Sequence, residues 1–276
     1  MEDILYEPNK YLKMGVAIWP RMFRELAGSR ELIWRLFIRD WSARYKQTAL
    51  GYIWTIVMPF IAIGTFMFLN RAGILNIGPT GMPYPLFALI GLAVWQLFAT
   101  GINSGCNSIV TAGSMISKIN FPLEALVFAS TAQAVFEFLV KSALIIVFFF
   151  VFRFVPSWGI ILFPLAVIPM LVLTLGLSLI LSLINGVLRD TANIVTILTM
   201  FLMFLTPVLY PVSTDKSILF KLNPLAPLVT APRDLIVHGR INDPVDFFIS
   251  SVLSFLVFFI CWRVFYIAKT KIPERV

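Results

Sequence analysis

Long apolar runs recur along most of the chain and are separated by short polar segments. Such runs can cross the hydrocarbon core of a bilayer, because about 20 helical residues span about 30 Å. A membrane β-barrel would instead alternate apolar and polar residues, and the run 144–151 does not alternate. We therefore predict an all-α integral membrane protein. Its six expected transmembrane helices cover residues 52–69, 85–111, 123–152, 160–188, 191–210 and 246–267.

The segment before the first apolar run has a pattern of its own. Apolar and aromatic residues recur at helical spacing, at Leu32, Ile33, Leu36, Phe37, Trp41 and Tyr45. Polar side chains share the opposite side, at Arg35, Arg39, Ser42 and Lys46. This pattern predicts an amphipathic helix at the membrane surface. Two compatible roles fit such a helix: a lipid anchor and a docking surface for a cytoplasmic subunit.

The stretch 211–246 departs most from plain spanning helices, because it mixes prolines with short apolar clusters. We expect two short re-entrant or interfacial helices within residues 212–239, joined at Asn223-Pro224. The second should end at His238-Gly239, where glycine terminates the helix. Irregular backbone at membrane depth is tolerated only against protein or a water-filled cavity. A gate over an exit path and a plain external cap both fit.

Between the second and third runs, residues 112–120 form a short polar turn that ends at Phe121-Pro122. Proline suits the first turn of the helix that follows. The turn fits either a simple connector or a short helix that pushes on a partner protein.

Composition and charge agree with a membrane protein. With 59% hydrophobic and 13% charged residues, the chain of 276 residues has more apolar surface than a water-soluble globule of this size can bury. Lys and Arg number 14 in the segments that an inside N-terminus makes cytoplasmic and 6 in the external ones. This bias predicts both termini in the cytoplasm. The net charge of +8 then serves orientation and contact with anionic membrane lipids, so nucleic acid is not an expected partner.

The resulting organisation has three parts. Residues 1–51 form a cytoplasmic N-terminal segment with the amphipathic helix, 52–267 the six-span transmembrane domain, and 268–276 a cytoplasmic tail. No cleavable signal peptide is expected, because the first long apolar run begins only near Tyr52.

The sequence offers little catalytic chemistry. Its one histidine, His238, falls in an external loop, and no cluster of His, Cys, Asp and Glu has metal-ligand spacing. Cys106 and Cys261 fall inside apolar runs, where a thiol behaves as a small hydrophobe. A phosphate-binding Gly-x-x-x-x-Gly-Lys-Ser/Thr motif is absent from the chain. We expect no catalytic residue, metal or cofactor in this chain, and any ATP-driven work would need another subunit.

Two charged pairs need explanation. Glu137 and Lys141 lie near the middle of the third expected span at a spacing of i, i+4, where a carboxylate can meet an ammonium group. Unpaired charges at that depth cost about 2.5 to 3.5 kcal/mol each. The pair is either a mutually neutralising buried contact or a polar element on a substrate or proton path. Arg189-Asp190, at the turn between the fourth and fifth spans, can cap helix ends and complement their dipoles.

Five motifs, in order along about 190 residues, are similar to those of one family, the ABC-2 type permeases that export O-antigen, capsular polysaccharide and teichoic acid. The first is Arg39-Asp40-x-x-x-Arg44-Tyr45-Lys46-x-Thr48-x-Leu50-Gly51-Tyr52-x-Trp54, followed by Pro59. The others are Lys118-Ile119-Asn120-Phe121-Pro122-x-Glu124, Asn185 with Arg189-Asp190, Thr206-Pro207-Val208-Leu209-Tyr210-Pro211, and Leu222-Asn223-Pro224-Leu225. The family often has Arg where this chain has Leu123, and a proline near Val127; these departures bear on the detailed contacts of the coupling region, not on the family.

This resemblance implies a homodimer of six-span subunits in the bacterial inner membrane, each joined to a separate cytoplasmic ABC ATPase that binds ATP and Mg, as a 2:2 complex. It implies three sets of site residues. The interface helix, at the substrate entry, would use Arg35, Arg39, Trp41, Arg44, Tyr45 and Lys46. Coupling to the ATPase would use Ser117, Lys118, Asn120, Phe121 and Pro122. The external gate would use Tyr210, Phe220, Asn223, Pro224 and Arg233.

On this reading an undecaprenyl-linked glycan enters from the cytoplasmic leaflet, and its sugar chain threads through a channel between the two permease subunits. Arg35, Arg39, Arg44 and Lys46 would attract the lipid pyrophosphate or an acidic partner surface. Three alternatives stay open: an ABC-2 exporter of another lipid or drug, an integral-membrane glycosyl or acyl transferase, and a passive channel. A transferase would need a cluster of acids or histidine at a membrane face.

Overall fold

The structure is a computed structural model that describes residues 18–46, 53–73, 78–116, 122–211 and 222–269. Throughout these ranges the regular structure is helical, with no strand, so the predicted all-α class is confirmed. The elements are α2 (Ile18–Gly28), α3 (Arg30–Lys46), α4 (Ile53–Arg71), α5 (Tyr84–Thr111), α6 (Gly113–Ile116), α7 (Glu124–Val151), η2 (Trp158–Leu162), α8 (Phe163–Val187), α9 (Thr191–Leu205), α11 (Leu225–His238) and α12 (Pro244–Ala268).

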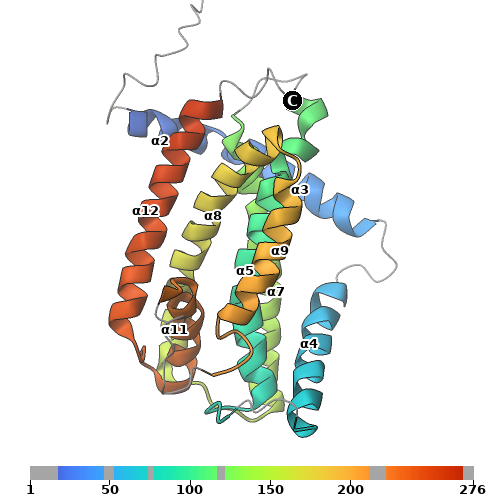
Figure 1. Ribbon diagram of the computed structural model, residues 1–276, viewed down its shortest axis with the longest axis vertical. Coiled ribbons are helices and arrows are strands. Elements are labelled where there is room, and N and C mark those ends of the chain that lie inside the picture. The colour runs from blue at the N-terminus through green and yellow to red at the C-terminus, as the bar shows by residue number, and fades with distance from the viewer. Residues whose placement is uncertain (1–17, 47–52, 74–77, 117–121, 212–221, 270–276) are drawn as a thin grey trace, which may run out of the picture.

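The long helices form one bundle around α5 (Figure 1). α5 packs most extensively against α7 and α8, while α12 packs against the other side of α8. Every residue from Leu86 to Trp95 is buried, so this half of α5 is the centre of the apolar core. Gly101 and Gly105 let α8 approach closely, because a Cβ at either glycine would collide with Thr174 or Ser178. The hydroxyl of Ser178 donates to the Gly101 carbonyl across this seam, at 3.2 Å.

Four of the described helical segments are long and apolar enough to cross a bilayer: α5, α7, η2 with α8, and α12. α4 and α9 are also apolar, but α9 has only 15 residues. The span predicted for this helix continues to 210, but the helix ends at Leu205. The reason is Pro207, which disfavours helical backbone at the preceding Thr206, and Thr206 is extended at φ −109°, ψ 137°. Six membrane crossings therefore stay a prediction.

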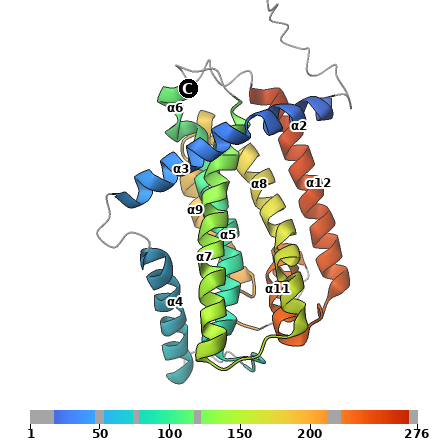
Figure 2. The same cartoon turned by 180° about the vertical axis from the view of Figure 1, so that it is seen from behind.

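Two helices lie across one end of the bundle, called here the α3 end (Figures 1 and 2). α3 is the helix predicted before the first apolar run. Its Leu36 and Phe37 are buried, while Arg35 and Arg39 are exposed. α2, which precedes it, was not predicted from the sequence. Its Ile18 and Met22, one turn apart, are buried in the same apolar cluster as Trp262 of α12.

The opposite end, called here the α11 end, carries the expected second external helix. α11 ends at His238, and Gly239 follows in the left-handed conformation at φ +71°, where its N–H caps the Leu235 carbonyl. The first of the two expected external helices falls on 212–221 and lies outside the described residues.

Candidate functional site

A pocket of about 600 Å³ lies between α3, α5 and α7 at the α3 end of the bundle. α5 provides most of its wall, with uncharged polar side chains at Thr100, Asn103, Ser104, Asn107 and Thr111. α7 adds Ser130 and Gln133, and α3 adds Arg39 and Asp40 at the side facing the surface helix. This volume lies within the range of about 300 to 1,000 Å³ that small-molecule sites occupy.

The polar wall of the pocket is one face of α5. Gln96, Thr100, Asn103, Asn107 and Thr111 recur every three or four residues, so they form a single stripe along the helix. This stripe was not predicted from the sequence, although its periodicity is visible within the second apolar run. Polar side chains inside a span are costly unless they are paired or line a path.

Hydrogen bonds to α8 and α9 hold the stripe in place. The Asn103 amide donates to the Ala99 carbonyl at 2.7 Å and to the Thr199 hydroxyl at 3.3 Å. Its oxygen accepts a bond from Thr196 at 2.8 Å. Asn185 of α8 donates to the Cys106 carbonyl at 3.1 Å and to the Asn107 oxygen at 3.3 Å. Asn185, named in the sequence motifs, thus orients a residue of the pocket wall.

Two cations of α3, Arg35 and Arg39, are paired with neighbouring carboxylates. Arg39 lies 2.7 Å from Asp40, and Arg35 lies 2.6 Å from Glu31. Both pairs are solvent-exposed, where such contacts are worth about 0 to 1 kcal/mol and exchange readily. Arg44, Tyr45 and Lys46 belong to α3, but their side chains lie outside the described residues.

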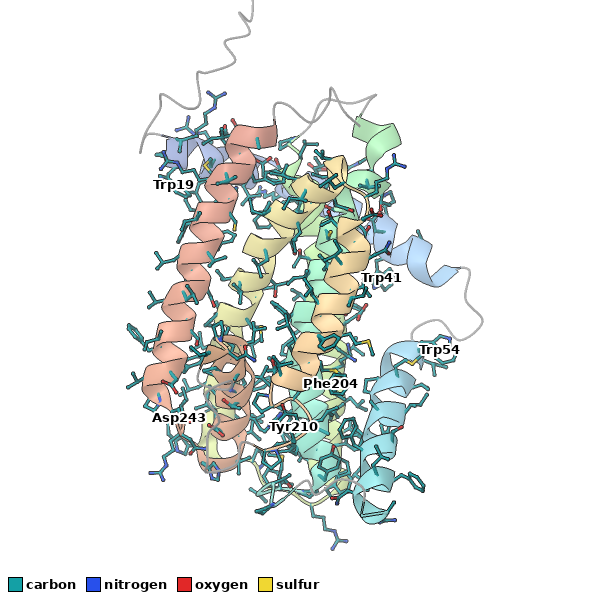
Figure 3. All side chains as sticks on the ribbon, viewed as in Figure 1. Trp19, Trp41, Trp54, Phe204, Tyr210 and Asp243 are labelled. Carbon is teal, nitrogen blue, oxygen red and sulfur yellow. The ribbon has the colours of Figure 1, made fainter. Side chains whose placement is uncertain are left out.

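Trp41 of α3 packs edge-on against Phe136 of α7, with ring centroids 5.8 Å apart. Figure 3 places Trp41 toward the α3 end and Tyr210 toward the other end of the bundle. The two expected sites, interface helix and external gate, therefore lie at opposite ends of the molecule.

The intramembrane pair of α7 is away from the pocket. Lys141 Nζ lies 3.6 Å from the Glu137 carboxylate, and both side chains are largely buried. Neither residue lines the pocket. This geometry favours the mutually neutralising contact over a path element.

Arg189 and Asp190 are exposed at the turn before α9. Asp190 occupies the N-cap position of α9, but its side chain makes no capping hydrogen bond. Thr191 instead bonds back to the Leu188 carbonyl at 2.6 Å. The capping contact expected for Asp190 is therefore not formed, and its carboxylate can act on α9 only through the helix dipole.

At the α11 end, a buried arginine joins α11 to the segment after α9. Arg233 donates to the Pro207 carbonyl at 3.2 Å and to the Val208 carbonyl at 2.8 Å, and its guanidinium lies 3.7 Å from the Phe87 ring centroid. The Tyr84 hydroxyl donates to the Leu209 carbonyl at 3.1 Å. We call Phe87, Pro207, Val208 and Arg233 the outer clamp.

Asn223 and Tyr210 reinforce the same region. The Asn223 amide donates to the Leu205 carbonyl at 3.1 Å and to the Thr206 hydroxyl at 3.0 Å, while its oxygen accepts the Leu225 N–H. Pro224 occupies the N-cap position of α11. The Tyr210 hydroxyl donates to the Phe204 carbonyl at 2.5 Å. Four of the five expected gate residues thus lie around the α9–α11 junction, and Phe220 lies outside the described residues.

The expected coupling segment is described only at its edges. α6 precedes it and Pro122 is its last residue, with the Pro122 carbonyl accepting the Ala125 N–H at 3.0 Å in the first turn of α7. Ser117, Lys118, Asn120 and Phe121 lie outside the described residues.

Comparison with known families decides the assignment. The family model for ABC-2 type transporters matches residues 31–237, which include the pocket and the outer clamp. The chain belongs to the ABC-2 type transporter family. This confirms the resemblance drawn from the five motifs.

Individual relatives of this ABC-2 chain extend over most of its length. It is 28% identical over 261 residues to an O-antigen export system permease protein of Myxococcus xanthus, covering 93% of the chain and 99% of that relative. A protein of the same description from Klebsiella pneumoniae is 30% identical over 211 residues, covering 74% and 79%. A polysialic acid transport protein of Escherichia coli is 21% identical over 233 residues, covering 82% and 88%.

Proposed function

We propose that this chain is the membrane permease subunit of an ATP-driven exporter that moves an undecaprenyl-linked polysaccharide of the O-antigen type out of the bacterial cytoplasm. The observation that carries the proposal is the match to an O-antigen export permease along 99% of that relative. A match of this extent covers 93% of the chain, not one shared segment.

The chemistry of the pocket supports a sugar as cargo. Amide and hydroxyl side chains such as Asn103, Asn107 and Ser104 both donate and accept hydrogen bonds, as sugar hydroxyls do. The stripe on α5 extends this wall along the helix axis, from Thr111 to Gln96. Glycan hydroxyls can therefore exchange hydrogen bonds stepwise along one helix face.

The arrangement of the α3 end supports a separate ATPase partner. α3, α6 and the start of α7 lie at the same end of the bundle (Figure 2). In the predicted topology, with both termini in the cytoplasm, this end faces the cytoplasm. In the proposed 2:2 assembly this side contacts the ATPase, which binds ATP and Mg. The second permease copy completes the channel, and the exposed apolar side chains of α9, among them Ile197, Phe201 and Phe204, face that copy or lipid.

The proposal is tested by co-expressing the chain with the ATPase gene beside its own and reconstituting the purified complex in lipid. We expect a stable 2:2 complex whose ATPase activity rises with lipid-linked glycan and which moves that glycan across vesicles. Complementation of a strain lacking the gene should restore surface polysaccharide. Nucleotide turnover by the isolated chain, or intact surface polysaccharide without it, would contradict the proposal.

A further inference from the structure

Three elements that are distant in sequence meet at one ammonium group at the α3 end. Lys269, at the end of α12, places Nζ 2.7 Å from Glu124 Oε1 at the start of α7 and 3.3 Å from Glu25 Oε2 in α2. The Tyr266 hydroxyl donates to Glu25 Oε1 at 2.8 Å, and Arg21 donates to the same oxygen at 2.9 Å. We call Glu25, Glu124, Tyr266 and Lys269 the Lys269 junction.

The junction is buried enough for its charges to interact strongly. The side chains of Glu124 and Lys269 are only 5% and 15% exposed, and that of Glu25 is 33% exposed. Burial opposes ionisation of Glu25, but the bonds from Arg21, Tyr266 and Lys269 outweigh it and lower its pKa. The Lys269 ammonium also lies 3.8 Å from the centre of the Tyr266 ring. One cation thus serves two carboxylates from different elements.

An apolar layer beneath the junction joins the same three elements. Trp262 of α12 is buried, with its ring centroid 4.8 Å from that of Phe23 in α2 and 6.5 Å from that of Phe128 in α7. Direct packing and the ion pairs therefore act on the same contact. A displacement of one element is resisted by both.

The place of Glu124 in the chain gives this contact a function. Glu124 begins α7, two residues after Pro122 and at the end of the segment through which the proposed ATPase would act. We propose that Lys269 is a positioning residue that makes α2, the start of α7 and the end of α12 move as one unit. A push on the segment before α7 then reaches α12 and α2 instead of being absorbed locally. This inference rests on the proposed function, because it requires an ATPase acting at that segment.

The first test measures glycan exported per ATP hydrolysed in the reconstituted complex with its ATPase. Lys269→Met should lower this ratio about fivefold or more, the range typical of coupling between linked sites, while ATP hydrolysis continues. The ratio does not depend on how much complex folds, so reduced yield does not obscure the result. Arg24→Gln is the matched control, because it removes an exposed charge from α2, next to Glu25 of the Lys269 junction. It should leave the ratio unchanged.

The second test replaces the ion pair with a covalent link. The second variant carries Glu124→Cys and Lys269→Cys in a background with Cys106→Ser and Cys261→Ser. It should export little glycan per ATP hydrolysed until a short bis-maleimide joins the two thiols. Cross-linking should then restore the ratio toward its native value, which a role in fold stability alone would not predict.

Two outcomes would overturn the inference: a native ratio in Lys269→Met, or a low ratio that persists after complete cross-linking. Failure of the proposed function looks different. In that case the unsubstituted complex itself would neither export glycan nor respond to it.

Discussion

Replacing Arg233 of the outer clamp should strongly destabilise the protein. The Arg233 side chain donates two hydrogen bonds to backbone carbonyls and lies over Phe87, and the residue is only 4% exposed. Arg233→Met keeps much of the apolar volume but leaves both carbonyls without this donor. The chain offers two graded comparisons, Arg233→Lys and Gly91→Ala.

The magnitude follows from these contacts. A hydrogen bond from a charged donor is worth about 1.5 to 3 kcal/mol, and a desolvated cation–π contact about 2 kcal/mol. The native state, in turn, carries the cost of burying the guanidinium, which methionine removes. We therefore expect a net loss of about 3 kcal/mol for Arg233→Met. Arg233→Lys should lose less, about 1 to 2 kcal/mol, because it retains the charge but not the planar fork.

Gly91→Ala tests the same clamp from the α5 side. A Cβ at residue 91 would overlap Arg233 Nη2 and the Val208 carbonyl oxygen, so the clamp must shift. Overpacking of this kind costs about 1 to 3 kcal/mol. Gly64→Ala is its control, because a Cβ there meets nothing within 4 Å.

The assay is thermal unfolding of the purified chain in detergent or nanodiscs, followed by circular dichroism. For a chain of this size, about 3 kcal/mol corresponds to a fall in unfolding temperature of about 6 to 12 °C. The unfolding temperature should be highest for the native protein, lower for Arg233→Lys and lowest for Arg233→Met. Equal unfolding temperatures for native protein and Arg233→Met would refute the reasoning.

Three further predictions concern the pocket and the two acid sites. Asn103→Leu or Asn107→Leu should lower glycan stimulation of the ATPase about tenfold, the effect of about 1.4 kcal/mol, and unchanged stimulation would contradict a role in glycan passage. Burial raises the pKa of Asp234 to about 6. The folded state therefore loses stability as Asp234 ionises between about pH 4 and pH 6. Asp234→Asn should remove this loss in unfolding curves measured at several pH values. Lys141→Met should destabilise the protein by about 3 kcal/mol or more, because it removes the ammonium group that faces the largely buried Glu137 carboxylate. Adding Glu137→Gln should recover most of this loss in the same unfolding assay.

The long helices of the bundle were predictable because their apolar runs are long and have few interruptions. α5, α7 and α12 begin and end within two residues of the expected spans, and α8 within three. The early end of α9 depended on one local rule, the effect of Pro207 on Thr206. α2 escaped prediction because it is short and carries only two fully buried side chains, Ile18 and Met22.

Side-chain partners were harder to predict than helices. Arg39 was expected to attract phosphate, yet its nearest acid, Asp40, is the next residue in the sequence. Arg233 was picked out as a gate residue, but its acceptors are backbone carbonyls whose direction depends on how the chain turns after α9. The polar stripe of α5 was present as a pattern and was overlooked because apolar residues dominate the run.

The glycine seam between α5 and α8 limits which parts of this protein can rearrange. Gly101 and Gly105 leave no room for the two backbones to slide past each other, and Ser178 bridges them. We expect α5 and α8 to act as a fixed frame during each transport cycle. The adjustable walls are then α4 and α9, whose surfaces contact this frame far less.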